Sequence, residues 1–379
     1  MYFRRMVAAL FCAATPLCAF AQGNVADISD PNSVIVTASR IEAPLAATVA
    51  SVTVISRADI ERLQPHSVLE LLCGLSGIFV SAGGDLGKNV SLFVRGTNPD
   101  HVLVLIDGVK IGSATAGQVA LEQLPVEQIE RIEIVRGPRS SLYGSDAIGG
   151  IIQIFTRHSA PGEAGRPSFE LTGGSHDTWQ AQAGYSGSSG PFWYNASASS
   201  LYTSGIPLCV AGAPVTAACY TTEPRQGYRS GSAAVSGGYQ LSDATRVSVD
   251  WLRADGDTQY DGDIYSGNES RVVQQAAGIE LQTAPLPRWR MSLTSGQSLD
   301  ESAQLFDGAP DGFFDTRRET LSWLNGLRVA TGQNLLLGVD YEQDTIGSGI
   351  DYAVRSRADT GAFGSYRFTP GRVDLEVSA

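Results

Sequence analysis

The most restrictive feature of this sequence is a long series of alternating apolar and polar residues that begins at Ser168. Segments of roughly ten residues alternate in this way, with Gly, Ser, Asp and Pro between them. In residues 247–251 the apolar side chains take the odd positions, and Trp289, Met291 and Leu293 also alternate with polar neighbours. Such strands are typical of a transmembrane β-barrel with a lipid side and a wet interior. A soluble β-sandwich alternates in the same way, so the pattern alone leaves both classes open.

Residues 1–21 have the three parts of a cleavable secretory signal peptide. Arginines at 4–5 form the positive end, residues 7–18 the apolar centre, and residues 19–21 a small-residue cleavage site. The apolar stretch is too short for a membrane-spanning helix, and Pro16 interrupts it. No later stretch approaches the ~20 apolar residues that such a helix needs. We therefore expect an exported chain that is periplasmic, secreted or an outer-membrane barrel.

The composition is acidic, and it offers little for catalysis. The formal net charge is −12 and no Lys/Arg cluster is present, which argues against nucleic acid as a partner. After signal cleavage three cysteines remain, Cys73, Cys209 and Cys219, beside four scattered histidines. These suggest no zinc site and no Cys–His nucleophile, so we expect no enzyme. Cys209 and Cys219 could close a disulfide in an oxidising compartment, and Cys73, among apolar residues with helical spacing, is predicted to be a buried thiol.

Residues 128–157 combine two strand signals with features that ordinary packing does not require. Residues 129–136 alternate but carry charge on both faces, and Gly137-Pro138 ends that strand. Gly144, Gly149 and Gly150 follow, where backbone can approach backbone closely. A β-branched run at residues 151–156 completes a strand–turn–strand unit.

This stretch resembles the end of the plug domain of TonB-dependent outer-membrane receptors, and its sequence is most similar to the cobalamin (vitamin B12) transporting branch. Three other segments resemble plug motifs in the same order: residues 33–38, 93–98 and 101–109. The resemblance implies an α/β plug domain followed by an antiparallel transmembrane β-barrel, and barrels of this family close with roughly 22 strands. We count ten or eleven candidate strands before residue 379, so we expect an incomplete barrel and a C-terminally truncated fragment.

The resemblance also divides the chain. A flexible segment at residues 22–47 would follow the signal peptide, residues 48–157 would form the plug, and residues 168–379 the first half of the barrel. The protein would then lie in the outer membrane, in contact with lipid, as a multi-pass barrel.

Within the flexible segment, one short β-prone run resembles the TonB box. It comprises Ser33, Val34, Ile35, Val36, Thr37 and Ala38. An extended segment on a tether can add a strand to a partner's sheet edge, and the resemblance implies that this partner is TonB. The alternative is an ordinary first strand.

Two glycine-rich loops, at residues 81–89 and 112–119, lack the spacing of a phosphate-binding loop. The resemblance implies that they form the floor of a ligand pocket, although plain solvated loops are the alternative. The expected ligand contacts are Asp85, Leu86, Lys88, Asn89, Ser113 and Ala114. Arg95 and Arg136 each precede a glycine, and the resemblance implies that they pair with barrel glutamates. The alternative for both is a surface arginine.

An acid-rich stretch near residues 254–270 is the one candidate metal site. Carboxylates at this density attract calcium, so Asp261, Asp263 and Glu269 are the candidate ligands, and the resemblance implies Asp261 and Glu269 in particular. The alternative is a solvated acidic loop. No other cofactor is expected.

These expectations combine into one function. The protein would bind cobalamin outside the cell and import it to the periplasm by TonB-dependent active transport. A ferric siderophore or haem receptor is the rival within the class, and both predict a large chelate as ligand. A passive porin or adhesin barrel would explain the alternation, but it would not explain the plug or residues 33–38.

Overall fold

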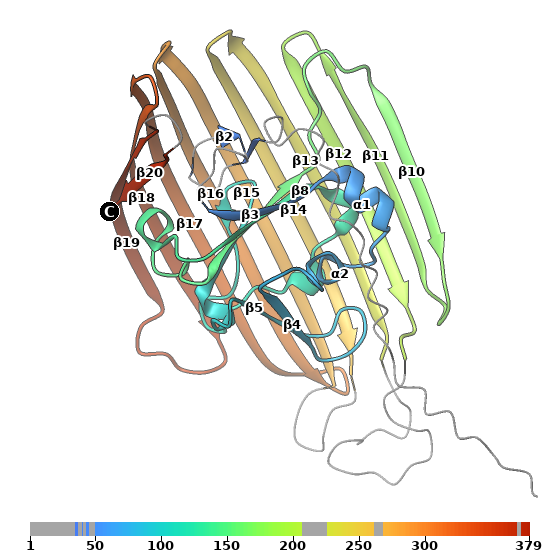
Figure 1. Ribbon diagram of the computed structural model, residues 1–379. Coiled ribbons are helices and arrows are strands. Elements are labelled where there is room, and N and C mark those ends of the chain that lie inside the picture. Colours follow the sequence, from blue (N-terminus) through green and yellow to red (C-terminus); the bar gives the residue numbers. More distant parts are fainter. Residues whose placement is uncertain are drawn as a thin grey trace, which may run out of the picture.

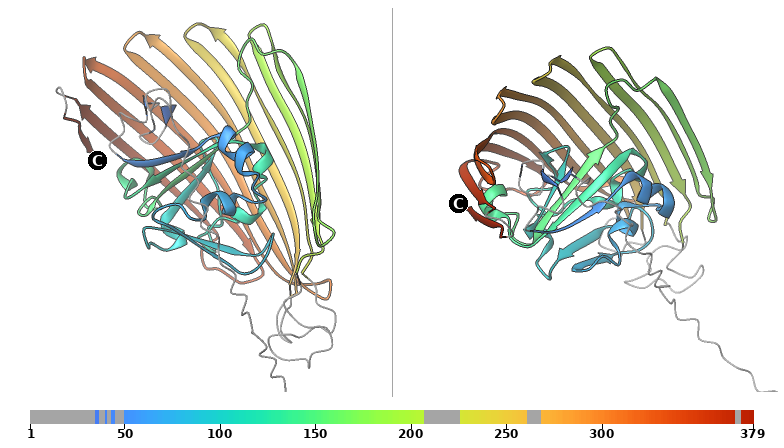
Figure 2. Two further views of the ribbon diagram at one scale, coloured as in Figure 1. Left: turned by 45° about the vertical axis from the view of Figure 1, so that its right-hand side comes forward. Right: turned by 45° about the horizontal axis from the view of Figure 1, so that its top comes forward.

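The computed structural model describes residues 35–36, 40, 43–44, 50–206, 226–260, 268–369 and 373–379. The predicted signal peptide, the predicted Cys209–Cys219 disulfide, Asp261 and Asp263 lie outside these ranges. An α/β domain, here called the plug, sits against the concave face of one large curved sheet, here called the wall (Figures 1 and 2). None of the helices in the described ranges combines the length and apolar character needed to cross a membrane.

The plug contains short helices and two small sheets. Its elements are β3 (Ser51–Ile55), α1 (Arg57–Leu63), α2 (Val68–Leu72), β4 (Ile78–Ala82), β5 (Val90–Val94), η2 (Pro99–His101), β6 (Val102–Ile106), β7 (Val109–Lys110), η3 (Leu121–Gln123), η4 (Val126–Gln128), β8 (Ile129–Arg136), α3 (Ser140–Tyr143) and β9 (Gly150–Thr156). One sheet has the order β3-β8-β9-β6-β7, in which β6 and β9 are parallel, and β4 pairs with β5 separately.

Local signals explain where the plug helices begin. The Ser56 side chain accepts from the backbone N–H of Asp59, whose carboxylate accepts in return, and Ser67 caps α2 through Glu70. Each cap stabilises its helix by about 1 kcal/mol. The Asp107-Gly108 turn joins β6 to β7 with positive φ at both residues, 47° and 82°, as a type I′ turn requires.

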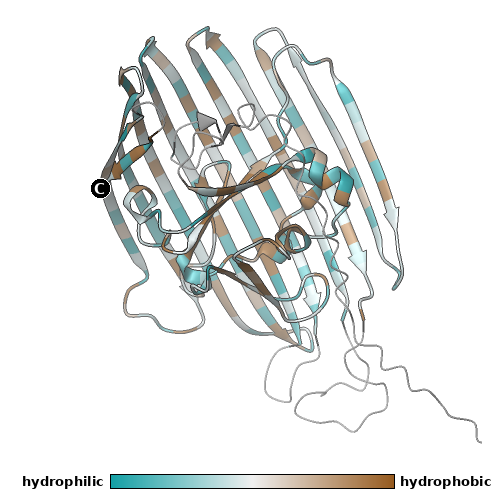
Figure 3. Cartoon of the chain, in the orientation of Figure 1, coloured by the Kyte–Doolittle hydropathy of each residue, from teal (hydrophilic) through white to brown (hydrophobic). Residues whose placement is uncertain are grey.

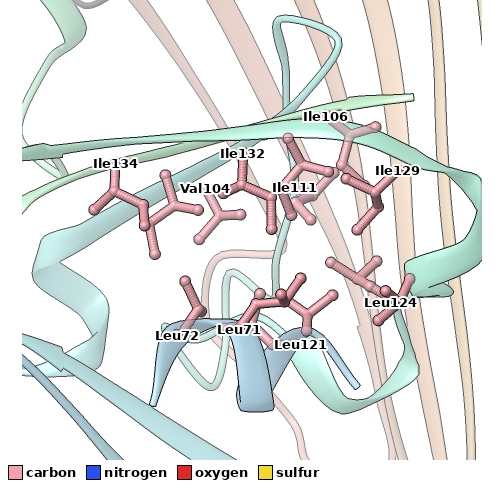
Figure 4. Packing of buried hydrophobic residues seen from close by; sticks show 14 of the residues in the cluster. Leu71, Leu72, Val104, Ile106, Ile111, Leu121, Leu124, Ile129, Ile132 and Ile134 are labelled. Carbon is pink, nitrogen blue, oxygen red and sulfur yellow. The ribbon is translucent and has the colours of Figure 1, made fainter. Parts of the chain in front are cut away.

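The plug core lies between its main sheet and its helices (Figure 4). Val104, Ile132 and Ile134 face Leu71 and Leu121 across this core, and all five are buried. β8 also carries charged residues. Glu133 is only 1% exposed, and its charge is balanced by Arg131 on the same strand, at 3.0 Å.

Gly150 confirms the predicted close approach of two backbones. It pairs with Arg136 across β8 and β9, where a Cβ would collide with the carbonyl oxygen of Val135.

Cys73 corrects one expectation, because its side chain is exposed. The buried face of α2 comprises Val68, Leu71 and Leu72, whereas Cys73 is the C-cap residue, with extended backbone angles of −60° and 134°. Its φ of −60° is still helical, so its side chain continues the helical direction, about 100° beyond Leu72 and away from the buried face.

The wall is an antiparallel sheet of eleven strands in sequence order, of which β10 and β20 are the edges within the described residues. The strands are β10 (Arg166–Gly173), β11 (Trp179–Ser189), β12 (Phe192–Thr203), β13 (Tyr228–Ser242), β14 (Thr245–Gln259), β15 (Glu269–Leu286), β16 (Trp289–Phe306), β17 (Ala309–Ala330), β18 (Gln333–Ser348), β19 (Ser356–Phe368) and β20 (Leu375–Ser378).

The alternation predicted from sequence runs along these strands (Figure 3). On β14 the outward Val249 is 52% exposed, whereas the inward Leu252 and Ala254 are buried. Leu321 and Trp323 on β17 are exposed in the same outward direction. The predicted fold, an α/β plug followed by an antiparallel barrel-type sheet that is not closed, is confirmed.

Candidate functional site

The described part of the N-terminal segment is paired with itself. β1 (Ile35–Val36), inside the predicted TonB box, forms an antiparallel pair with β2 (Ala43–Pro44). The other residues of that box, Ser33, Val34, Thr37 and Ala38, lie outside the described ranges.

Arg40, between β1 and β2, ties this segment to the wall. Its Nη2 lies 2.7 Å from Asp340 Oδ2, and its Nη1 donates to Asp340 Oδ1 at 3.0 Å. The guanidinium also stacks on the rings of Tyr143 in the plug and Phe363 on β19, with its carbon 4.2 and 4.6 Å from the ring centroids. We call this contact the N-terminal latch. Because the Arg40 side chain is only 12% exposed, loss of one partner would leave a poorly solvated charge.

A second set of charges lies where the plug meets β17 and β18, and we call it the ionic seam; Lys110–Glu342 and the Arg318 bond to the Gly112 carbonyl cross from plug to wall. Lys110 Nζ lies 2.7 Å from Glu342 and 2.7 Å from Asp146. Arg318, 4% exposed, pairs with Asp344 at 2.7 Å and donates to the carbonyl of Gly112 at 3.3 Å. Paired and hydrogen-bonded charges of this kind are costly to separate once buried.

Beside the ionic seam, the plug hairpin fits a glycine pair of the wall. Gly278 and Gly296 face each other across β15 and β16. A Cβ would lie 3.0 Å from Val109 Cγ2 at Gly278 and 2.7 Å from it at Gly296. The two glycines therefore leave the space that Val109 on β7 occupies.

The first predicted ligand loop joins β4 to β5, and its residues have different environments. Asp85 and Asn89 are exposed and Leu86 is half-buried, whereas Lys88 is only 5% exposed. Its Nζ donates to the carbonyl oxygens of Gln226, at 3.2 Å, and Gln259. Lys88 thus anchors the loop to β14 and the residues before β13.

The second predicted ligand loop lies beside the first. Gln118 donates to Asn89 Oδ1 at 3.4 Å and accepts from Ser91 Oγ at 3.3 Å, which connects the two loops. Ser113 and Ala114 are half-buried, and the backbone N–H of Ala114 donates to Thr316 Oγ1 at 3.0 Å. The structure therefore brings the two predicted loops together, although it does not test ligand binding.

Arg95 and Arg136 lie close together beside Gly77 of the plug, with Arg136 buried and Arg95 exposed. Arg136 donates to Thr53 Oγ1 at 2.8 Å, and burial together with the charge of Arg95 lowers the pKa of Arg136. A Cβ at Gly137 would lie 2.8 Å from Arg95 Nη1, which explains the Arg-Gly pattern there. Neither arginine pairs with a wall carboxylate among the residues described, so the predicted pairing stays a prediction.

His158, just after β9, joins the end of the plug to the wall. Its Nε2 lies 2.7 Å from Asp250 Oδ1 on β14, and its Nδ1 lies 2.6 Å from the carbonyl oxygen of Thr156. Both neighbours are acceptors, so the doubly protonated ring satisfies both bonds. Burial lowers the pKa of His158, but the hydrogen bond to Asp250 and the charge of Asp107 outweigh it and raise the pKa to about 9.

In the part of the acidic stretch that the structure describes, arginine side chains pair with the carboxylates. Glu269 pairs with Arg271 at 2.9 Å, Asp257 lies 3.4 Å from the same arginine, and Asp255 pairs with Arg253 at 3.0 Å. The described residues contain no group of three or more metal-type ligands. Calcium binding by Asp261, Asp263 and Glu269 stays a prediction.

Sequence reasoning missed the latch and the His158 junction. The only local signals were a basic residue two positions after the predicted TonB box and a histidine directly after the plug. Neither signal says which wall residue lies opposite.

Comparisons with known proteins agree with this architecture. Residues 44–151 match the TonB-dependent Receptor Plug Domain family. Vitamin B12 transporters BtuB of Photobacterium profundum and Vibrio vulnificus are each 32% identical to this chain over 93% of its length. The chain is therefore a TonB-dependent receptor, with its plug domain seated on an antiparallel β-wall. It spans 57% of the length of each of these curated relatives.

Solved structures share the fold at low sequence identity. FpvA of P. aeruginosa bound to a pyoverdine–iron complex has a TM-score of 0.72 and 13% identity, with 93% of this chain and 54% of that chain covered. The siderophore receptor PirA from Acinetobacter baumannii has a TM-score of 0.66 and 18% identity, with 86% and 55% covered.

Proposed function

We propose that the protein is an outer-membrane receptor that imports cobalamin, with TonB pulling on its N-terminal segment. The observation that carries the proposal is the N-terminal latch, which connects the segment after residues 33–38 to both plug and wall. A pulling force on that segment would act first on the contacts of Arg40 and then on the plug domain, which follows in the chain. Residues 33–38 would join TonB as an added strand, through main-chain hydrogen bonds.

Cobalamin is the proposed ligand because two relatives that align with 93% of the chain are vitamin B12 transporters. A ferric siderophore or haem is the second candidate, because the siderophore receptor PirA shares the fold.

Three further roles belong to this proposal. The two plug loops would form the pocket floor, with Asp85, Leu86, Asn89, Ser113 and Ala114 facing the ligand and Lys88 holding the first loop in place. Asp261, Asp263 and Glu269 would bind calcium. A lower cobalamin affinity in the presence of a calcium chelator would support this role. Cys209 and Cys219 would form a disulfide, which peptide mass mapping under non-reducing conditions would detect.

The test is binding and uptake of labelled cyanocobalamin by outer membranes and cells that carry the protein from its native gene. We expect saturable binding, and deletion of residues 33–38 should abolish uptake but keep binding. Uptake that survives the deletion would indicate a passive pore. A folded protein that binds a ferric chelate instead would overturn the ligand.

A further inference from the structure

Two buried threonines of the wall hold the predicted ligand loops of the plug. Thr258 on β14 donates from its Oγ1 to the carbonyl oxygen of Gly87 in the first loop, at 2.8 Å. Thr316 on β17 accepts from the backbone N–H of Ala114 in the second loop, at 3.0 Å. Inward side chains beyond these threonines, on the side away from the plug core, are therefore the described wall groups that a molecule resting on the loops would meet.

Strand register identifies three inward residues in that position. Tyr260 follows Thr258 by two positions, and its backbone N–H still bonds, at 3.0 Å, to the residue before β15, so the alternation of the strand reaches it. On β16, Gln304 lies four positions beyond the buried, inward Asp300 and opposite Ser270 of β15. We call Tyr260, Ser270 and Gln304 the outer polar cluster.

Hydrogen bonds within the outer polar cluster fix the orientation of the Gln304 amide. Tyr260 Oη donates to Gln304 Oε1, and Gln304 Nε2 donates to Ser270 Oγ at 3.3 Å. All three side chains are half-buried, so they are held in place and still reachable from the interior of the wall. A carboxamide has two N–H donors and two acceptor lone pairs. Within the described ranges, both ends of the Gln304 amide therefore keep capacity for one further hydrogen bond.

Open space lies beside Gln304 on the inner face. Gly312 pairs with Gln304 across β16 and β17, and a Cβ added at Gly312 would meet no atom within 4 Å. The register of these two strands also shifts between Gln304 and Leu305, which marks a β-bulge. Bulges often re-aim a side chain beside a functional site. The Gln304 amide is thus held in a fixed orientation next to space that a ligand group can enter.

We propose that the outer polar cluster is a subsite of the wall that binds a carboxamide group of the ligand. This inference rests on the proposed function and adds the chemistry of one contact. Gln304 donates an N–H to the amide oxygen of the ligand and accepts an N–H from it, a reciprocal pair that only another carboxamide completes. Tyr260 and Ser270 are positioning residues that hold the Gln304 amide. The carboxamide side chains of a corrin ring are groups of the required kind.

Equilibrium binding of labelled cyanocobalamin tests the subsite in outer membranes that carry the protein from its native gene. We expect Gln304→Ala to raise the Kd about tenfold without changing the number of binding sites, because the reciprocal hydrogen bonds are lost. Gln304→Glu should act in the same direction, since a carboxylate cannot donate to the amide oxygen of the ligand. A folding defect would instead lower the number of sites.

The outward face of the wall offers a matched control. There Tyr341 Oη donates to Gln343 Oε1 at 3.0 Å, the same pair of groups as in the outer polar cluster. Gln343→Ala should therefore bind cyanocobalamin with the Kd of the unmodified protein.

A footprint at the same position gives a second readout. Gln304→Cys and Gln343→Cys are each labelled with a thiol reagent, and peptide mass spectrometry measures the label at the substituted position alone. Saturating cyanocobalamin should abolish labelling of Gln304→Cys and leave that of Gln343→Cys unchanged.

The outcomes separate the subsite from the proposed function. If the unmodified protein binds cyanocobalamin, the subsite is overturned by an unchanged Kd in Gln304→Ala, by an equal rise in Gln343→Ala, or by labelling of Gln304→Cys that cyanocobalamin does not affect. In each of these cases the proposed import function stands. If the unmodified protein binds no cyanocobalamin, the proposed ligand is wrong and the subsite is overturned with it.

Discussion

At the scale of single residues, a few charged side chains decide how the N-terminal segment and the plug are attached. Arg40 forms an ion pair and two aromatic contacts. Because its side chain is only 12% exposed, this ion pair should stabilise the protein more than an ion pair on the surface does. His158 plays the matching role at the other end of the plug, against Asp250.

Arg40→Ala should release the N-terminal segment. Loss of the latch removes the arginine from Asp340 and leaves it only the hydrogen bond from Ser322 Oγ, so we expect the attached state to lose about 1–3 kcal/mol. Proteinase K cleavage within residues 22–47 should become about tenfold faster or more. Arg367→Ala is the matched control, because it removes an arginine–aspartate ion pair, with Asp374 at 2.6 Å, that is not part of the latch. Equal protection in wild type and Arg40→Ala would contradict the latch.

His158 predicts a pH dependence of plug attachment. Its pKa is raised from 6.5 to about 9, so the folded form holds a proton that the unfolded form releases. The stabilisation is fully present below pH 6.5 and is lost as pH rises through about 9. Urea unfolding followed across this window should show stability falling with pH in wild type and a flatter profile in His158→Gln. Identical profiles would exclude the junction.

At the scale of elements, the plug and wall fit because β7 meets a glycine pair. Val109 packs where Gly278 and Gly296 leave room, and the neighbouring Lys110 then reaches Glu342. The hairpin turn places both contacts on two adjacent residues, so apolar and ionic attachment depend on the same element.

Gly296→Ala should therefore disturb the seating of the plug. The new methyl group would meet Val109 at 2.7 Å, and overpacking of this kind costs about 1–3 kcal/mol. We expect the plug to unfold at lower urea concentration, as followed by fluorescence of a probe attached to the exposed Cys73. Gly231→Ala on β13 is the control, because nothing lies within 4 Å of its added methyl. Equal effects of the two substitutions would show that general sheet strain, and not this contact, is responsible.

At the scale of the whole molecule, the wall separates two environments. Outward Leu321 and Trp323 are 45% and 46% exposed, whereas the inward face carries the plug. Large exposed apolar surfaces of this extent suit lipid contact better than water.

Leu321→Arg should destabilise the protein in phospholipid vesicles by about 2–4 kcal/mol, because its charge would enter hydrocarbon. Gln297→Arg, outward on β16 and within reach of Glu319, should cost far less. Unfolding free energies measured in vesicles would test this, and equal costs would argue against a bilayer around β17.

Short-range signals were sufficient for much of the architecture. Alternation predicted the wall, and Gly150 predicted the close approach of two backbones, because each signal depends on residues only a few positions apart. The helix caps at Ser56 and Ser67 and the Asp107-Gly108 turn are local in the same way. The Cys73 environment was predicted wrongly, because apolar neighbours in sequence do not make a residue part of the buried face: Val68, Leu71 and Leu72 share one side of α2, and Cys73 lies on another.

The attachments could not be predicted in the same way. Arg40 and Asp340 are 300 positions apart, Lys110 and Glu342 are 232 apart, and His158 and Asp250 are 92 apart. Any inward polar residue of the wall was an equally good partner until strand register and plug orientation were known. The hydrophobic periodicity predicts which residues face inward. Which inward side chain lies opposite each plug residue depends on how the eleven strands pair and how the plug packs on them, and only the tertiary structure gives this.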